Sequence, residues 1–312
     1  MLRDWFSGPS DAKLKTVRVD LGSRVLRMPV ADLRGNKQGK TLLITGGMDG
    51  DEYAGIEAAY QLAKKFQACD FAGRLVVIPI VNLPGFEAEC SLNPLDHRYP
   101  KFVFPGRCDG SPTERLIHWL VTTYVQEADV WWDLHGGSLT ERMTPFLWTF
   151  ETGVASVDAF MKTLHATVPA EPVLFERAER SSKAARLARR GCVYVLAESG
   201  DRIRRAEDVT RHCEWVECLM GLLGMIKCSS RKSSPALTIL RRVYYAEAPF
   251  DGLWYLEAMI PDRLNKGEPL GVCVRRDESG QHPIRSPASG RVLWWKETPS
   301  ITRGDILCAI GQ

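Results

Sequence analysis

Acidic and imidazole side chains stand at the ends of three short apolar runs of the sequence, at residues 41–47, 128–135 and 192–199. These side chains are Asp49, Asp51, Glu52, Asp133, His135 and Glu198. Metal-assisted hydrolysis needs two or three nitrogen or oxygen ligands, an open coordination position and a separate carboxylate that acts as a base. The set therefore predicts a site at which a divalent metal ion activates a water molecule.

The elements that must position these groups are apolar runs that alternate with stretches of helical periodicity. The alternation predicts an α/β fold with a mostly parallel, mixed central sheet that is covered by helices on both faces. In such sheets ligands bind beyond the carboxyl ends of the strands, so the chemical groups should meet at one edge. The expected strands are residues 41–47, 74–82, 128–135 and 192–199, and the expected helices are residues 52–66, 112–128, 157–168 and 207–226.

A polar break, CSSRKSSP at residues 228–235, divides the chain. We predict a catalytic α/β domain at 1–228, a linker at 229–235 and a small C-terminal all-β domain, barrel-like or sandwich-like, at 236–312. Within the first domain, residues 1–40 form a β extension whose two strand-like runs should pack on the edge of the sheet.

Several motifs, in this order along the chain, resemble those of the succinylglutamate desuccinylase/aspartoacylase family of zinc carboxypeptidase-like hydrolases. Members of that family carry Gly-x-His-Gly-Asp-Glu after a first strand, Asp-Leu-His after a later one and a Glu after a further one. The matching residues here are Gly47 to Glu52, Asp133 to His135, and Glu198. The stretch FPGRCDGSPTERL is also similar to a family motif, so the resemblance covers nearly the whole chain.

The resemblance implies that Asp49, Glu52 and His135 hold one divalent metal ion and that Glu198 is the general base. Asp133 and Asp51 would support these groups from behind. Relatives have His where this chain has Asp49, and a second carboxylate makes the ligand set more anionic and the metal a weaker Lewis acid. We therefore expect Zn²⁺ first, with Mn or Fe admitted by the Asp49 carboxylate.

A second departure from the family concerns the substrate. Relatives place an Asn-Leu-Asn-Arg type of stretch before Phe-Pro-Gly, whereas this chain has Tyr99-Pro100-Lys101-Phe102. The bidentate guanidinium clamp for a carboxylate is lost there. We expect Arg98, Lys101 and Arg107 to supply positive charge for substrate binding instead, and the substrate to be a less acidic amide, aromatic or larger in shape.

Each of these residues also has a purely structural interpretation. Asp49 could form a turn between glycines, and Glu52 could favour the positive end of a helix. The pair Trp131-Trp132 is typical of a strand that is buried on both faces. The basic run at residues 177–190 is typical of a solvated helix or loop face.

Composition limits the classes of partner. The chain has 41 basic and 38 acidic residues, a net charge of +3, which gives no electrostatic reason to expect nucleic acid or a membrane surface. No stretch approaches the roughly 20 apolar residues of a membrane span, and no apolar leader begins the chain, so we expect a cytoplasmic protein. The nine cysteines show no C-x-x-C spacing, which argues against a thiolate zinc site and a disulfide framework.

The most economical interpretation is a metal-dependent amidohydrolase, a deacylase that cleaves the amide bond of a small N-acyl amino-acid-like substrate. Its partner would be that small molecule, and strands in the C-terminal domain leave room for a homo-oligomer. Two alternatives stay open because a fold does not fix a function. One is a family member that only binds a small molecule or a partner, and the other is a metalloenzyme with divergent biosynthetic chemistry.

Overall fold

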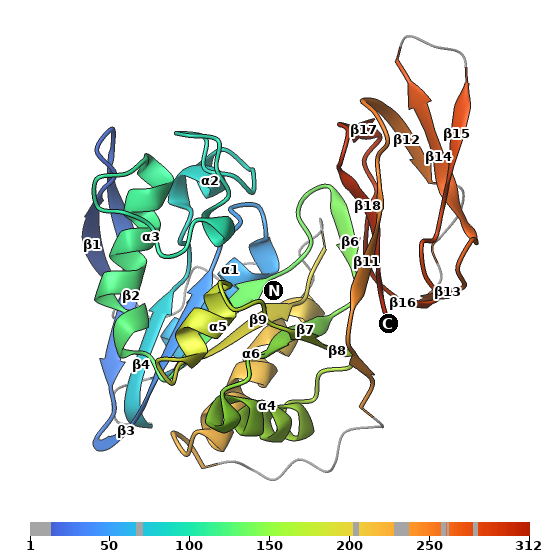
Figure 1. The fold of residues 1–312 in the computed structure, drawn as a ribbon. Coiled ribbons are helices and arrows are strands. Elements are labelled where there is room, and N and C mark those ends of the chain that lie inside the picture. The colour runs from blue at the N-terminus through green and yellow to red at the C-terminus, as the bar shows by residue number, and fades with distance from the viewer. Residues whose placement is uncertain are drawn as a thin grey trace.

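The computed structural model describes residues 14–66, 71–201, 206–227, 237–256, 260, 262–276 and 280–312, and the predicted linker at 229–235 lies outside these ranges. A nine-stranded mixed sheet forms the larger part of the fold, with the strand order β1-β2-β4-β3-β5-β9-β7-β8-β10 (Figure 1). Its central strands are parallel, and they are β4 (Ala72–Ile78), β3 (Lys37–Gly46), β5 (Val130–His135) and β9 (Val193–Glu198). The predicted α/β fold class is confirmed.

Antiparallel pairing makes the sheet mixed at its edges. The strand-like runs expected near the N-terminus are the edge strands β1 (Lys15–Asp20) and β2 (Val25–Arg34). At the other side, β7 (Phe146–Glu151) pairs antiparallel with β9 and parallel with β8 (Val173–Arg177), which pairs with β10 (Ile239–Leu240). The periodicity analysis did not predict β7 and β8.

Helices cover both faces of the sheet. One face packs against α1 (Tyr53–Lys65), α4 (Ala155–Thr167) and α6 (Ala206–Leu222), and the other against α3 (Pro112–Thr123) and α5 (Lys183–Ala188). Trp132 belongs to the first core and its neighbour Trp131 to the second, because successive side chains of a strand point to opposite faces. The structural interpretation of this tryptophan pair is therefore correct. No helix among the described residues is long and apolar enough to cross a bilayer.

The C-terminal part contains two antiparallel sheets that enclose a core of their own. The first contains β11 (Val243–Glu247), β18 (Ile306–Gly311), β16 (Gly290–Lys296) and β13 (Arg263–Leu264). The second contains β15 (Gln281–Arg285), β14 (Pro269–Arg275), β12 (Gly252–Leu256) and β17 (Ser300–Ile301). This arrangement is a β-sandwich attached to the α/β part.

A short strand joins the two parts. β6 (Glu141–Met143), from the chain between β5 and β7, pairs with β16 of the sandwich (Figure 1). Arg291 of β16 donates two hydrogen bonds to the carboxylate of Glu171, at 2.7 and 2.9 Å. The first sandwich sheet therefore stands beside the carboxyl ends of the central strands.

His212 of α6 joins the ends of two central strands. Its Nε2 lies 3.0 Å from the carbonyl oxygen of His135 and 2.9 Å from that of Ser199, so it carries the proton and donates to both. The ring is fully buried, and its Nδ1 has no partner among the described residues. Burial lowers the pKa of His212 to about 4, since a second proton would sit on that isolated nitrogen.

This arrangement predicts a loss of stability in mild acid. An unfolded histidine takes up a proton near its ordinary pKa of about 6.5, whereas folded His212 resists protonation down to about 4, so the free energy of unfolding should fall with pH across that window. The His212 contribution amounts to roughly 3 kcal/mol. Denaturant unfolding of wild type and His212→Gln, which keeps a donor but does not titrate, should diverge between pH 8 and pH 4. Parallel curves would contradict this assignment.

Candidate metal centre

The loop after β3 carries two of the predicted ligands. Gly47 adopts φ +59°, a left-handed conformation that turns the chain out of the strand. A Cβ on Gly50 would lie 2.3 Å from the backbone of Gly85, so the loop packs directly on α2 (Leu83–Glu87). The turn places Asp49 over the strand end and Glu52 at the start of α1. The glycines thus fix the direction of both carboxylates.

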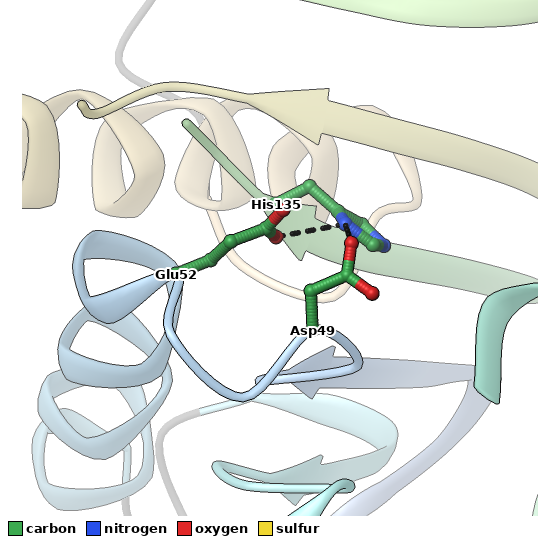
Figure 2. A group of neighbouring side chains, drawn as sticks. All are labelled: Asp49, Glu52 and His135. Atoms are coloured by element: carbon green, nitrogen blue, oxygen red, sulfur yellow. Dashed lines mark ion pairs between the residues drawn. The ribbon is translucent and has the colours of Figure 1, made fainter. Parts of the chain in front are cut away.

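His135 ends β5 and meets these carboxylates (Figure 2). Its Nδ1 lies 2.9 Å from Glu52 Oε2 and 3.9 Å from Asp49 Oδ2. One ligand atom from each of the three residues lies within 4.8 Å of the other two, and the three are 1–5% exposed. The structure therefore brings together the three residues that the sequence predicted as ligands.

The charges of this cluster suit a cation. Burial and the neighbouring Asp49 carboxylate raise the pKa of Glu52 well above its ordinary value. Burial opposes a charge on His135, but Glu52 and Asp133 outweigh it and hold the pKa of the imidazole well above the usual range. Asp49 Oδ1 is buried without a hydrogen-bond partner among the described residues. Two carboxylates, one of which has an oxygen without a hydrogen bond, and one imidazole form a donor set that fits Zn²⁺ or a harder divalent metal ion.

Asp133 lies beside His135, on the side away from the other two predicted ligands. Its Oδ1 accepts a 2.5 Å hydrogen bond from the Thr45 hydroxyl, and its Oδ2 accepts one of 2.9 Å from the Tyr194 hydroxyl. The same Oδ2 lies 3.3 Å from His135 Nε2. The Asp133 carboxylate therefore lies beside Nε2 of the imidazole, while Nδ1 faces Glu52.

Asp51 has a different supporting role. Its Oδ1 accepts a 2.6 Å hydrogen bond from the Ser91 hydroxyl, and its Oδ2 lies 3.4 Å from the backbone nitrogen of Leu139. Asp51 therefore connects the ligand loop to the segment after α2 and to the segment after His135. It stabilises the loops around the cluster rather than a ligand itself.

Lys101 contacts Asp49, one of the three predicted metal ligands. It belongs to the 3₁₀ turn η2 (Pro100–Phe102), and its ammonium donates a short hydrogen bond to Asp49 Oδ2. Burial opposes its charge, but Asp49 and Glu52 raise the pKa of Lys101 above its ordinary value. The carboxylate of Asp49 adds one negative charge that a histidine would not have, and the Lys101 ammonium balances it.

Glu198 ends β9 and pairs in register with His135 on the neighbouring strand. Its side chain lines the same cavity as Glu52 and His135, and it is 7% exposed. Burial raises the pKa of Glu198 to about 7, although His135 and Lys101 lower it in part. A carboxylate with a pKa near neutrality is suited to take up a proton and return it.

The other two predicted substrate cations lie elsewhere. Arg98 contacts the Ser111 hydroxyl at 3.4 Å and the Glu114 carboxylate at 3.4 Å, and Arg107 pairs with Asp109 at 3.1 Å. Neither arginine is among the described residues that line the cavity at Glu198. Of the three cations proposed from sequence, only Lys101 reaches the cluster.

The sequence interpretation missed Lys183. The basic run at 177–190 was expected to be a solvated face, but α5 lies within it and buries Ala184, Ala185, Leu187 and Ala188. Lys183, at the start of this helix, lines the cavity. The signal was present in the apolar residues inside the run, whose spacing predicts a helix with one buried face.

Comparisons with known proteins identify the family of the chain. The profile of the succinylglutamate desuccinylase/aspartoacylase catalytic domain matches residues 38–211, more than half of the chain. N-alpha-acetyl-L-2,4-diaminobutyric acid deacetylase of Halomonas elongata is 25% identical over 283 residues, which cover 88% of this chain and 83% of that protein.

Solved structures show the same fold. A succinylglutamate desuccinylase/aspartoacylase from Rhodobacter sphaeroides has a TM-score of 0.84 and 22% identity, covering 96% of this chain and 94% of that chain. The product-bound ectoine utilization protein EutE from Ruegeria pomeroyi has a TM-score of 0.84 and 23% identity with the same coverage. The chain thus belongs to the succinylglutamate desuccinylase/aspartoacylase family and is an amidohydrolase that acts on C–N bonds.

Proposed function

We propose that this protein is a metal-dependent deacylase that hydrolyses the amide bond of a small N-acyl amino-acid-like substrate. The observation that carries the proposal is the convergence of Asp49, Glu52 and His135 at a cavity that Glu198 also lines. The Halomonas relative, whose name describes removal of an acetyl group from an amino acid, supports the same reaction class. Its substrate is not assigned to this chain.

The proposed mechanism divides the work among the bound metal ion, Glu198 and Lys101. When bound by Asp49, Glu52 and His135, a divalent metal, Zn²⁺ by family resemblance, supplies Lewis acidity for a carbonyl and lowers the pKa of water. Glu198 accepts the proton of the attacking water and later donates it to the leaving amine nitrogen. The Lys101 ammonium lines the same cavity and stabilises negative charge that develops on the carbonyl oxygen.

Lys101 also favours a second candidate function. An ammonium on Asp49 supplies a positive charge to the cluster without any metal. A family member that uses this internal cation would bind a small molecule in the cavity without hydrolysing it. Metal content separates the two functions, because only the deacylase needs an ion at the cluster.

The metal assignment predicts one divalent ion per chain. His135→Ala and Glu52→Ala should each weaken binding at least about 100-fold, since even partners behind a ligand cost 10- to 100-fold. Elemental analysis after dialysis and calorimetric titration with Zn²⁺ measure this loss. Glu151→Gln is the control, because Glu151 is an exposed carboxylate at the end of β7 and takes no part in the cluster. Equal metal content in wild type and His135→Ala would contradict the assignment.

The contact of Lys101 with Asp49 predicts that removal of the ammonium strengthens metal binding. Lys101→Met removes a positive charge that competes for Asp49, so Zn²⁺ affinity should increase by about tenfold or more. Lys40→Met is the control, because Lys40 lies at the opposite end of β3 and pairs with Asp129. Weaker Zn²⁺ binding by Lys101→Met would show that the ammonium holds Asp49 in place for the ion. A metal-free wild type with a metal-binding Lys101→Met would favour the second function.

The general-base assignment predicts that Glu198→Gln keeps its bound metal and loses about 10²- to 10⁴-fold in kcat. The amide has nearly the same shape as the carboxylate but does not accept a proton at neutral pH. Turnover of a panel of N-acyl amino acids measures the effect, with Glu151→Gln on the exposed end of β7 as a control. Unchanged turnover in Glu198→Gln would remove Glu198 from the mechanism.

A further inference from the structure

The cavity beside the metal centre is large, and aromatic side chains form part of its wall. Its volume is about 610 Å³, far more than an acetyl group fills. Its walls include Trp148 and Phe150 from β7, Tyr194 from β9, Tyr245 from β11 and Trp294 from β16. Both the α/β part and the sandwich contribute to this aromatic wall, so the sandwich completes the cavity.

The rings of the wall form a continuous path. The centroids of Trp294 and Trp148 are 6.1 Å apart, and those of Trp148 and Phe150 are 6.4 Å apart. Phe150 stacks on Tyr194 at 6.1 Å with an interplanar angle of 14°. Such a path offers flat apolar contact to a planar group of a ligand.

One cation stands at the end of this path. Lys183 Nζ lies 4.1 Å from the ring centroid of Tyr194 and 4.9 Å from that of Trp131, and its side chain is 15% exposed. Burial lowers the pKa of Lys183 to about 8, so the amine still carries its proton at pH 7. The ammonium therefore faces the cavity as a charge with little water around it.

Within the part of the chain that the structure describes, this ammonium is incompletely paired. Asp133 Oδ2 is 3.9 Å from Lys183 Nζ, which is beyond hydrogen-bond distance. Both oxygens of Asp133 already accept hydrogen bonds, from Thr45 and Tyr194. A carboxylate on a ligand would complete the hydrogen bonding of Lys183 in a site that excludes water.

The ammonium is also close to the reacting groups. Asp133 Oδ2 lies 3.3 Å from His135 Nε2, so Lys183 Nζ is no farther from the imidazole than the two contacts placed end to end. Lys183 lines the same cavity as His135 and Glu198, so an anion that reaches its ammonium shares that cavity with an amide bond at the cluster.

We infer that the cavity selects aromatic N-acyl amino acids, with the substrate carboxylate on Lys183 and the flat group against the aromatic wall. This inference rests on the proposed deacylase function and deepens it. The absence of the relatives' guanidinium clamp at Lys101 and Phe102 agrees with this inference. The single ammonium of Lys183 suits a substrate that has one carboxylate rather than two. Lys183 would then determine the specificity for the carboxylate, and the aromatic wall would determine the specificity for the flat group.

Three probes separate the two contacts. N-acetyl-L-phenylalanine has both groups, N-acetyl-2-phenylethylamine lacks the carboxylate, and N-acetyl-L-alanine lacks the ring. Wild type should prefer the first in kcat/KM. Lys183→Met should raise KM for N-acetyl-L-phenylalanine about 10- to 100-fold and change the phenylethylamine probe less than about threefold. N-benzoylglycine shows whether a ring on the acyl side is accepted equally.

Control variants test whether the effect depends on the positive charge at position 183. Lys183→Arg should restore most of the affinity for the carboxylate, whereas Lys162→Met on the exposed side of α4 should change nothing. Trp148→Leu should lower the ratio of kcat/KM for N-acetyl-L-phenylalanine to kcat/KM for N-acetyl-L-alanine. Equal losses for the carboxylate and phenylethylamine probes in Lys183→Met, or no preference for the ring in wild type, would overturn the inference.

A binding measurement separates this inference from the proposed function. If wild type loaded with Zn²⁺ hydrolyses no probe, the deacylase proposal fails, and calorimetry with N-acetyl-L-phenylalanine still tests Lys183. Binding that Lys183→Met weakens at least tenfold would support the site without hydrolysis. Binding that is absent, or equal in wild type and Lys183→Met, would refute it.

Discussion

Two buried carboxylates cannot both keep their negative charges without a nearby cation, and this constraint governs the centre of the molecule. Asp49 and Glu52 are almost fully enclosed, and the Asp49 carboxylate raises the cost of a negative charge on Glu52. The Lys101 ammonium on Asp49 balances one of the two charges. The raised pKa of His135 favours a proton on the imidazole beside Glu52, and a bound divalent ion would take the place of that proton. A substitution of His by Asp in the ligand loop is therefore matched by a lysine that reaches the same carboxylate.

The fold holds this costly arrangement in place. Parallel strands deliver His135 and Glu198 side by side, and His212 of α6 bonds to the backbone at both strand ends. Gly50 lets the ligand loop lie against α2. The sandwich then encloses the cavity through β11 and β16, so the part farthest along the chain shapes what the centre can bind.

Much of this centre could be predicted from the sequence because its residues follow regular elements. Strand ends in a parallel sheet meet at one edge, which brought Asp49, Glu52 and His135 together as expected. The contact of Lys101 with Asp49 depends on how the η2 turn folds back, and no local pattern encodes that approach. Lys183 was hidden in a basic run, and the aromatic wall comes from strands far apart in sequence, so neither was predicted.

Anomalous X-ray scattering from crystals of the purified protein tests the central claim most directly. Data recorded on both sides of the zinc, iron and manganese absorption edges would locate and identify an ion. The account predicts one peak that Asp49, Glu52 and His135 share. A map without any peak, and with the ammonium between the two carboxylates, would contradict it.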